Sequence, residues 1–236
     1  MENNKLLVVT PTYNESENIE NFVSSVINKD LNLLIIDDNS PDGTGKIVKR
    51  LQEEFKNLHL IIRNKKLGLG SAYKEGFQWA IKREFKFTIS MDADFSHRIE
   101  DLDRLINSLS NEDLILGSRY IFGGSSSGWD KKRKILSSTA NKISKKVIRT
   151  DINDLTTGFR IYKTDALETI DFGKIQSDGY AFQIEMVFLF IDTNKRIKEI
   201  PIIFEERRLG KSKMSKRIVF EAIILLIKLI FRKKNY

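Results

Sequence analysis

Two aspartates separated by one residue, Asp92 and Asp94, directly follow the short apolar run of residues 87–91. In an extended segment, side chains at positions i and i+2 point to the same side, so both carboxylates can hold one hard divalent cation. The sequence has no cysteine and two histidines, so a metal here is held mainly by oxygen, which favours Mg²⁺ or Mn²⁺. The alternative is that the pair caps the helix that follows.

Three neighbouring features carry weaker signals. A second Asp-x-Asp pair, Asp101 and Asp103, lies within a helical pattern in which the two residues do not share a face, so we interpret it as solvated surface. His97 follows the first pair closely, and either a contact with the site or a surface or capping role fits it equally well. Residues 68–71 lack the spacing of a glycine-rich phosphate loop, and we interpret them as a plain helix start, with a helix that opens near a ligand as the alternative.

Polar residues also follow other apolar runs, at residues 11–15, 37–40 and 117–119. In open α/β sheets, ligands bind beyond the carboxyl ends of the strands. Counting the end at Asp92, three of these four ends carry carboxylates. An edge this acidic would repel a phosphate unless a cation lies there, so the arrangement predicts a divalent metal beside a phosphorylated ligand.

The elements that would position these residues alternate along the chain. Apolar runs predict buried strands, and spacings of three and four residues between apolar positions predict helices. We expect strands at 6–10, 33–36, 58–62, 87–91 and 114–116, and helices at 19–27, 47–55, 68–81 and 99–109. This order predicts an α/β fold, with a mostly parallel central sheet and helices on both faces.

The alternation breaks after residue 120. We expect a flexible loop at 123–128, a basic helix at 131–149, strands at 158–162 and 197–204, and a helix around 180–190 between them. This half is predicted to add strands to the same sheet and to close over its ligand edge.

Charge is uneven along the chain. The net charge is +8, and residues 205–236 contain ten Lys or Arg against three Glu. Residues 131–149 contain eight Lys or Arg and no acidic residue. Two cationic patches on a nearly neutral body suit the phosphates of a nucleotide or a lipid surface, although a solvated lysine-rich face is the alternative for each. The pattern does not favour a nucleic-acid binder, because no motif of base-stacking aromatic and basic residues accompanies it.

The last stretch, residues 217–236, is predicted to be an amphipathic helix lying in a membrane interface. Its charged residues fall on one narrow stripe: Arg217, Glu221, Lys228 and Arg232. The apolar run 218–231 is interrupted by charges and is too short to span a bilayer. A core or dimer-interface helix is the alternative. We therefore divide the chain into one domain of residues 1–216 and the interfacial helix.

Eight segments in a fixed order together resemble the dolichyl-phosphate (polyprenyl-phosphate) mannose synthases, which are family-2 glycosyltransferases with the Rossmann-like GT-A fold. The segments are PTYNE, IIDDNSPDGT, MDADFSH, LGSRY, GWDKKRK, DLTTGFRIY, SDGYAFQIEM and RRLGKSKMS. They extend from about residue 6 to residue 216. The resemblance implies an inverting transfer of mannose from GDP-mannose to a dolichyl or polyprenyl monophosphate, for glycosylation at a membrane.

The resemblance also implies roles for individual residues. The residues that match the nucleotide-binding positions are Pro11, Tyr13, Glu15, Ile36 and Asp38. Asp92 and Asp94 match the metal ligands, with Ala93 between them, and Ser96 stands where some relatives have a glutamine as an extra ligand. Serine is a weaker oxygen ligand than glutamine. The cations that match positions engaging the diphosphate and the acceptor phosphate are Arg119, Arg133, Arg207 and Lys213.

Other functions remain open from the residues alone. A glucosyltransferase that uses UDP-glucose and a polyprenyl phosphate shares the PTYNE, DD and DAD segments. A non-catalytic membrane subunit that binds a nucleotide sugar is a second alternative, although it would have no need of the acidic cluster. We expect the protein to lie peripherally on the cytoplasmic side of a membrane. A membrane-subunit partner and a homodimer are both open.

Overall fold

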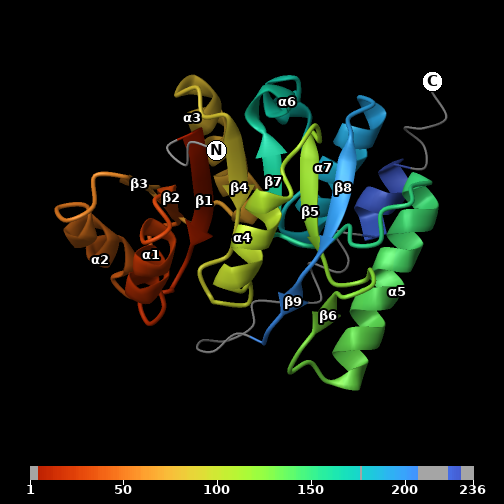
Figure 1. The fold of residues 1–236 in the computed structure, drawn as a ribbon, viewed down its shortest axis with the longest axis horizontal. Helices are drawn as coiled ribbons and strands as arrows, with labels where there is room; N and C mark the ends of the chain where they lie inside the picture. Colours follow the sequence, from red (N-terminus) through yellow and green to blue (C-terminus); the bar gives the residue numbers. More distant parts are fainter. Residues whose placement is uncertain (1–4, 176, 207–222, 230–236) are drawn as a thin grey trace.

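The computed structural model describes residues 5–175, 177–206 and 223–229. Its main sheet has seven strands in the order β3-β2-β1-β4-β7-β5-β8 (Figure 1). The strands are β1 (Leu6–Thr12), β2 (Asn32–Asp37), β3 (Leu58–Ile62), β4 (Phe87–Ser90), β5 (Leu114–Ser118), β7 (Arg160–Lys163) and β8 (Ile197–Pro201). All neighbouring pairs are parallel except those of β7, which runs antiparallel to β4 and to β5.

Helices cover both faces of this sheet. Alternate residues of β1 point to opposite faces: Leu7 and Val9 belong to one apolar cluster, and Leu6 and Val8 belong to the other. The first cluster includes α3 (Leu69–Lys82), α6 (Thr164–Glu168) and α7 (Gly179–Asp192). The second includes α1 (Ile19–Ile27), α2 (Thr44–Leu51) and α4 (Ile99–Asn107). The predicted α/β fold is confirmed, and its double burial explains why the strands are continuous apolar runs.

The half after residue 120 differs in detail from the expectation. The segment expected to be a flexible loop contains β6 (Ser125–Ser126), which pairs with β9 (Ile203–Phe204). Ile202 separates β9 from β8, and its backbone N–H donates to the carbonyl of Ser118. The basic helix is present as α5 (Lys131–Ile148), and a short 3₁₀ turn, η2 (Phe172–Lys174), precedes α7.

The interpretation of Asp101 as solvated surface is wrong. Its side chain is 1% exposed and accepts a hydrogen bond from the backbone N–H of Ile203 at 3.0 Å. Asp103 lies on the solvent side of α4, where it pairs with Lys29. The helical spacing separated the two residues as expected, but it gave no indication that the strand-forming segment at 203–204 would cover one of them.

Part of the predicted C-terminal helix falls within the described residues. Residues 223–229 are helical, and Leu225 and Leu229 pack into the first apolar cluster while Ile223 and Ile227 are about half exposed. Three members of the predicted polar stripe, Arg217, Glu221 and Arg232, lie outside the described residues. No helix in the described part of the chain is both long and apolar enough to cross a membrane.

Candidate active site

A cavity of about 330 Å³ lies where the carboxyl ends of β1, β2 and β4 meet the first turns of α3 and α7. Most of the residues predicted for the site line it: Pro11, Tyr13, Glu15, Asp38, Asp92, Ala93, Asp94, Ser96 and Arg133. Ile36 does not, because its side chain is fully buried in the core beneath the end of β2. Arg207 and Lys213 lie outside the described residues.

Asp38 shapes one wall of the cavity. Its carboxylate pairs with Arg63 and accepts hydrogen bonds from the backbone N–H groups of Leu67 and Gly68 at 3.2 and 3.0 Å. These contacts fix the loop that leads into α3. Lys66 of the same loop places its ammonium 3.9 Å from the centroid of the Tyr13 ring. A flat aromatic ring and a cation at one rim of the cavity suit a nucleotide base.

Gly68 shows that the start of α3 belongs to the site, so its interpretation as a plain helix start is wrong. Gly68 and Leu69 both line the cavity. Gly68 has a φ of +96°, and a Cβ atom there would lie 2.0 Å from the nearer carboxylate oxygen of Asp178. Only glycine fits both the backbone conformation and the close approach.

Asp92 and Asp94 both line the cavity, but the backbone conformation that places them there differs from the expected one. The chain turns after Asp92, and Phe95 has a φ of +58°, so Asp92 and Asp94 are not on an extended segment. Asp94 is buried, and one of its oxygens accepts a hydrogen bond from the backbone N–H of Ser96 at 3.0 Å. Neither carboxylate caps α4, whose N-cap residue is Arg98 and has no side-chain cap.

Asp92 has two polar neighbours below the cavity. Its side chain is 39% exposed, with one oxygen 3.5 Å from the hydroxyl of Tyr73 and the other 3.5 Å from Nε2 of His97. Burial, and then the charge of Asp92, raise the pKa of Tyr73 well above its ordinary value, so this hydroxyl keeps its proton. His97 is 1% exposed between the rings of Phe159 and Phe204. Of its two expected roles, the contact with the site is the one the structure shows.

The donor set of the acidic pair fits a hard divalent cation. Two carboxylates reach one cavity, and oxygen ligands are those that Mg²⁺ and Mn²⁺ prefer. No group of three His, Asp or Glu side chains that could hold a metal occurs in the described part of the chain. The remaining ligands of a cation at Asp92 and Asp94 would then come from a bound diphosphate or from water.

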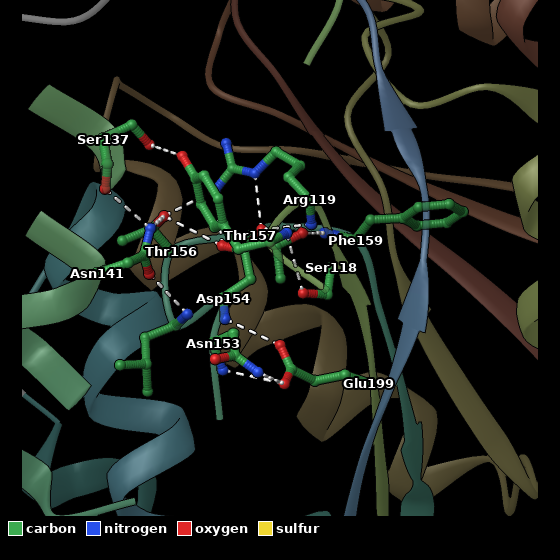
Figure 2. A network of polar contacts seen from close by, with 12 residues as sticks. Ser118, Arg119, Ser137, Asn141, Asn153, Asp154, Thr156, Thr157, Phe159 and Glu199 are labelled. Carbon is green, nitrogen blue, oxygen red and sulfur yellow. Dashed lines mark hydrogen bonds and ion pairs between the residues drawn. The ribbon is translucent and has the colours of Figure 1, made fainter. Parts of the chain in front are cut away.

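The predicted cations occupy different surroundings. Arg133 lines the cavity, with its guanidinium 4.2 Å from the centroid of the Trp129 indole and 3.4 Å from a carboxylate oxygen of Glu206. Arg119 is buried, and its guanidinium is directed at Asp154, as Figure 2 shows. A direct contact of Arg119 with a diphosphate therefore stays a prediction, and the structure favours a positioning role for it.

The roles of four cavity residues in the segment 178–183 had not been assigned from the sequence. Asp178 is the N-cap residue of α7, and Gly179, Tyr180 and Gln183 belong to its first two turns. Burial raises the pKa of Tyr180, and the charges of Asp92 and Asp94 raise it further against the opposing effect of Arg119 and Arg133. Gln183 could have been noticed, because it and Glu185 are the two polar residues in the otherwise apolar run 181–190.

A Rossmann-like sheet, a carboxylate pair after β4 and a nucleotide-sized cavity at the carboxyl ends of the strands define the GT-A class of nucleotide-sugar-dependent glycosyltransferases. The family model described as glycosyl transferase family 2 matches residues 7–171, and the chain belongs to that family. The family relationship that the motifs indicated is thereby confirmed.

Two curated relatives are similar over most of their length. The chain is 40% identical over 223 residues to a polyprenol monophosphomannose synthase of Mycolicibacterium smegmatis, covering 93% of this chain and 84% of the relative. It is 39% identical over 222 residues to an undecaprenyl-phosphate mannosyltransferase of Micrococcus luteus, covering 93% of this chain and 91% of the relative.

Solved structures of lower sequence similarity share the fold. Glucosyl-3-phosphoglycerate synthase from Mycobacterium tuberculosis, in complex with Mn²⁺, UDP-glucose and phosphoglyceric acid, aligns with a TM-score of 0.72 at 15% identity, covering 96% of this chain and 79% of that one. A mannosyltransferase from Pyrobaculum calidifontis, in complex with GDP-mannose and Mn²⁺, aligns with a TM-score of 0.54 at 15% identity, covering 96% and 72%. At this identity the similarity concerns the fold alone.

Proposed function

We propose that this protein transfers mannose from GDP-mannose to a polyprenyl or dolichyl monophosphate, with inversion at the anomeric carbon. The observation that carries the proposal is the similarity, at about 40% identity over 93% of the chain, to two enzymes named for this class of reaction. The cavity supports it, because a carboxylate pair and Arg133 line the same space. Such a space suits a metal-bound diphosphate beside a second phosphate.

Different residues of the cavity bind the donor and the acceptor. Tyr13 and Lys66 hold the nucleotide base, and Asp92 and Asp94 would hold the divalent cation that offsets the charge of the diphosphate. Arg133 faces the acceptor phosphate. When bound, Mg²⁺ or Mn²⁺ supplies positive charge that stabilises the departing diphosphate.

The acceptor needs little activation by the protein. A lipid monophosphate is already ionised at neutral pH, so one of its oxygens attacks the anomeric carbon without a strong general base. A bond forms between that oxygen and C1 of mannose, while the bond between C1 and the β-phosphate oxygen breaks. GDP leaves with the electron pair, and the configuration at C1 inverts.

The surface supports a peripheral position at the cytoplasmic side of a membrane. On α5, the apolar side chains of Ile135, Leu136 and Ile143 are 66%, 47% and 51% exposed, and lysines surround them in the sequence. Apolar residues inserted among lysines suit an interface of anionic lipid, where the acceptor is found.

Transfer of radiolabelled mannose into an organic-soluble product tests the proposal. The protein is incubated with labelled GDP-mannose and a short polyprenyl phosphate, with Mg²⁺ or Mn²⁺ and with EDTA in parallel. Metal-dependent label in the lipid fraction is the expected result. Transfer from UDP-glucose alone would establish the glucosyltransferase, and nucleotide-sugar binding without any transfer would indicate a non-catalytic subunit.

A further inference from the structure

The first turn of α7 presents polar groups to the cavity that neither the nucleotide nor the two phosphates account for. Asp178 and Gln183 both line the cavity, five residues apart. The stretch of α7 from Ala181 to Phe190 is buried throughout, and its only other polar residue, Glu185, accepts a hydrogen bond from the hydroxyl of Ser177. A polar group on the buried face of such a helix is costly unless something satisfies it.

The amide oxygen of Gln183 has no such partner in the described part of the chain. Its side chain is 2% exposed, and Oε1 accepts no hydrogen bond from a described residue. A buried acceptor left without a partner is destabilising by about 1–3 kcal/mol. Because Gln183 lines the cavity, a ligand that enters the cavity can supply the missing hydrogen bond.

Gly158 marks the space that this ligand would occupy. A Cβ atom on Gly158 would lie 3.7 Å both from Nε2 of Gln183 and from one carboxylate oxygen of Asp92. The amide of Gln183 and the proposed metal ligand therefore border the same small volume, and Gly158 keeps it clear. The group of the substrate next to a metal-bound diphosphate is the donor sugar.

Asp178 lines the cavity, and only one of its two carboxylate oxygens accepts hydrogen bonds from described residues. Its Oδ1 accepts hydrogen bonds from the backbone N–H groups of Gly70 and Gly179, at 2.5 and 2.8 Å. It thereby accepts one N–H group at the N-terminal end of each of α3 and α7. Oδ2 lies over Gly68, which also lines the cavity, and no hydrogen bond to Oδ2 comes from a described residue.

The charge of Asp178 decides what kind of group it can bind. A carboxylate repels a phosphate, and at each of the two helix ends that could otherwise attract one, Asp178 already accepts one backbone N–H group. Its remaining oxygen suits a neutral donor such as a hydroxyl group. An amide such as that of Gln183 both donates to and accepts from hydroxyls.

We propose that Asp178 and Gln183 form the subsite that binds the hydroxyl groups of the donor hexose. This inference rests on the proposed function, in that it assumes a nucleotide sugar in the cavity. The subsite discriminates between hexoses because a polar group built to meet a hydroxyl is left unpaired by a sugar that lacks it.

Calorimetry with the full chain in the presence of Mn²⁺ tests the subsite by comparing GDP-mannose with GDP. We expect Gln183→Met and Asp178→Asn each to weaken the binding of GDP-mannose about tenfold, while the Kd for GDP changes less than twofold. Asp178→Asn retains an oxygen for the two backbone N–H groups, so it tests the subsite if Gln183→Met fails to fold. Gln78→Met, at an exposed position on α3, is the matched control.

A second measurement separates hydroxyl binding from a structural role. GDP-mannose analogues that each lack one ring hydroxyl are compared on the original protein and on Gln183→Met. One analogue is expected to bind the original protein about tenfold more weakly than GDP-mannose does. The Gln183→Met variant is expected to bind that analogue and GDP-mannose with equal affinity. Equal weakening of GDP and GDP-mannose, or unchanged discrimination in both variants, would overturn the inference.

Failure of the proposed function gives a different result. If the original protein binds UDP-glucose and not GDP-mannose, the proposed donor is wrong, and the same variants are compared with UDP-glucose against UDP. Loss of the sugar-dependent part of that affinity would still support the subsite. If the variants leave it unchanged, Asp178 and Gln183 do not bind the sugar.

Discussion

The guanidinium of Arg119 and the carboxylate of Asp154 form a buried ion pair with two parallel hydrogen bonds of 2.7 Å (Figure 2). The backbone N–H of Arg119 donates a third bond to the same carboxylate, and Nη2 of Arg119 also reaches the hydroxyl of Thr156. Arg119 follows β5, and Thr156 lines the cavity. The pair therefore holds the loop that carries Thr156 and Gly158 against the end of β5.

Further polar contacts fix the same loop. The backbone N–H groups of Asn153 and Asp154 donate to the carboxylate of Glu199 on β8. Asn141 on α5 accepts from the backbone N–H of Leu155 at 2.8 Å. These contacts and the Arg119 pair tie β5, β8 and α5 to one side of the cavity, as Figure 2 shows.

We predict that Arg119→Met lowers the free energy of unfolding by about 3–5 kcal/mol, because it leaves the buried carboxylate of Asp154 without a partner. Burial raises the pKa of Asp154, but the charge and hydrogen bonds of Arg119 more than reverse this effect, so its pKa lies below the ordinary value. That stabilisation is present above the unfolded pKa of about 4 and is lost as the pH falls through the folded pKa. Urea denaturation at several pH values measures it.

In Arg119→Met, the contribution of Asp154 to the free energy of unfolding depends on pH in the opposite sense. Without Arg119, burial remains and raises the pKa of Asp154, so the loss of stability is expected to be larger at pH 7 than near pH 4. The double variant Arg119→Met with Asp154→Leu is the control, and should recover much of the stability. A loss in the single variant that does not change with pH would contradict this account of the ion pair.

Asp94→Ala is expected to reduce sugar transfer at least a hundredfold while the protein stays folded. Its carboxylate accepts a hydrogen bond from the backbone N–H of Ser96, and a bond of this kind contributes about 1 kcal/mol to stability. Loss of a metal ligand instead removes charge stabilisation worth several kcal/mol in the transition state. Steady-state kinetics with a Mn²⁺ titration measure the effect, and Asp103→Ala on the exposed side of α4 is the control. Full activity of Asp94→Ala would remove this residue from the metal site.

The first half of the fold follows directly from the sequence. The runs 6–9 in β1 and 33–36 in β2 are apolar on both faces, which favours strands buried between layers of helices. The second half was harder, because β7 is inserted antiparallel between β4 and β5, far from its neighbours in the chain. Local spacing carries no information about such a long-range pairing.

The residues of the site also divide into those that local sequence predicts and those that depend on long-range packing. Asp92 and Asp94 were identified by their place after a buried strand, although the turn at Phe95, and not an extended segment, directs them to the cavity. Ile36 and Arg119 were assigned from motif positions, and the structure places both in buried contacts that only the packed fold defines. Gln183 stands out in the sequence as an amide in a mostly apolar run, but its unpartnered oxygen is defined only by the packed fold.

Arg133→Ala is expected to raise the KM for the polyprenyl phosphate about tenfold with a smaller effect on kcat, because a charge-assisted contact with the acceptor phosphate would be lost. The guanidinium lines the cavity and packs on the ring of Trp129, so its position is fixed before the acceptor binds. Lys132→Ala, an exposed neighbour that does not line the cavity, is the matched control. An unchanged KM for both substrates would remove Arg133 from the site.

The exposed apolar residues of α5 and of residues 223–229 give the last prediction, which concerns the membrane. Deleting residues 217–236 would also remove Leu225 and Leu229 from the core, so release of a truncated protein from liposomes would not identify the anchor. Replacing the exposed residues by serine leaves the core intact. We expect Ile135→Ser with Ile143→Ser, and separately Ile223→Ser with Ile227→Ser, each to weaken binding to anionic liposomes about tenfold in a flotation assay. The matched control is Ile62→Ser, at an exposed position on β3, and equal binding by all three proteins would show that the membrane contacts another surface.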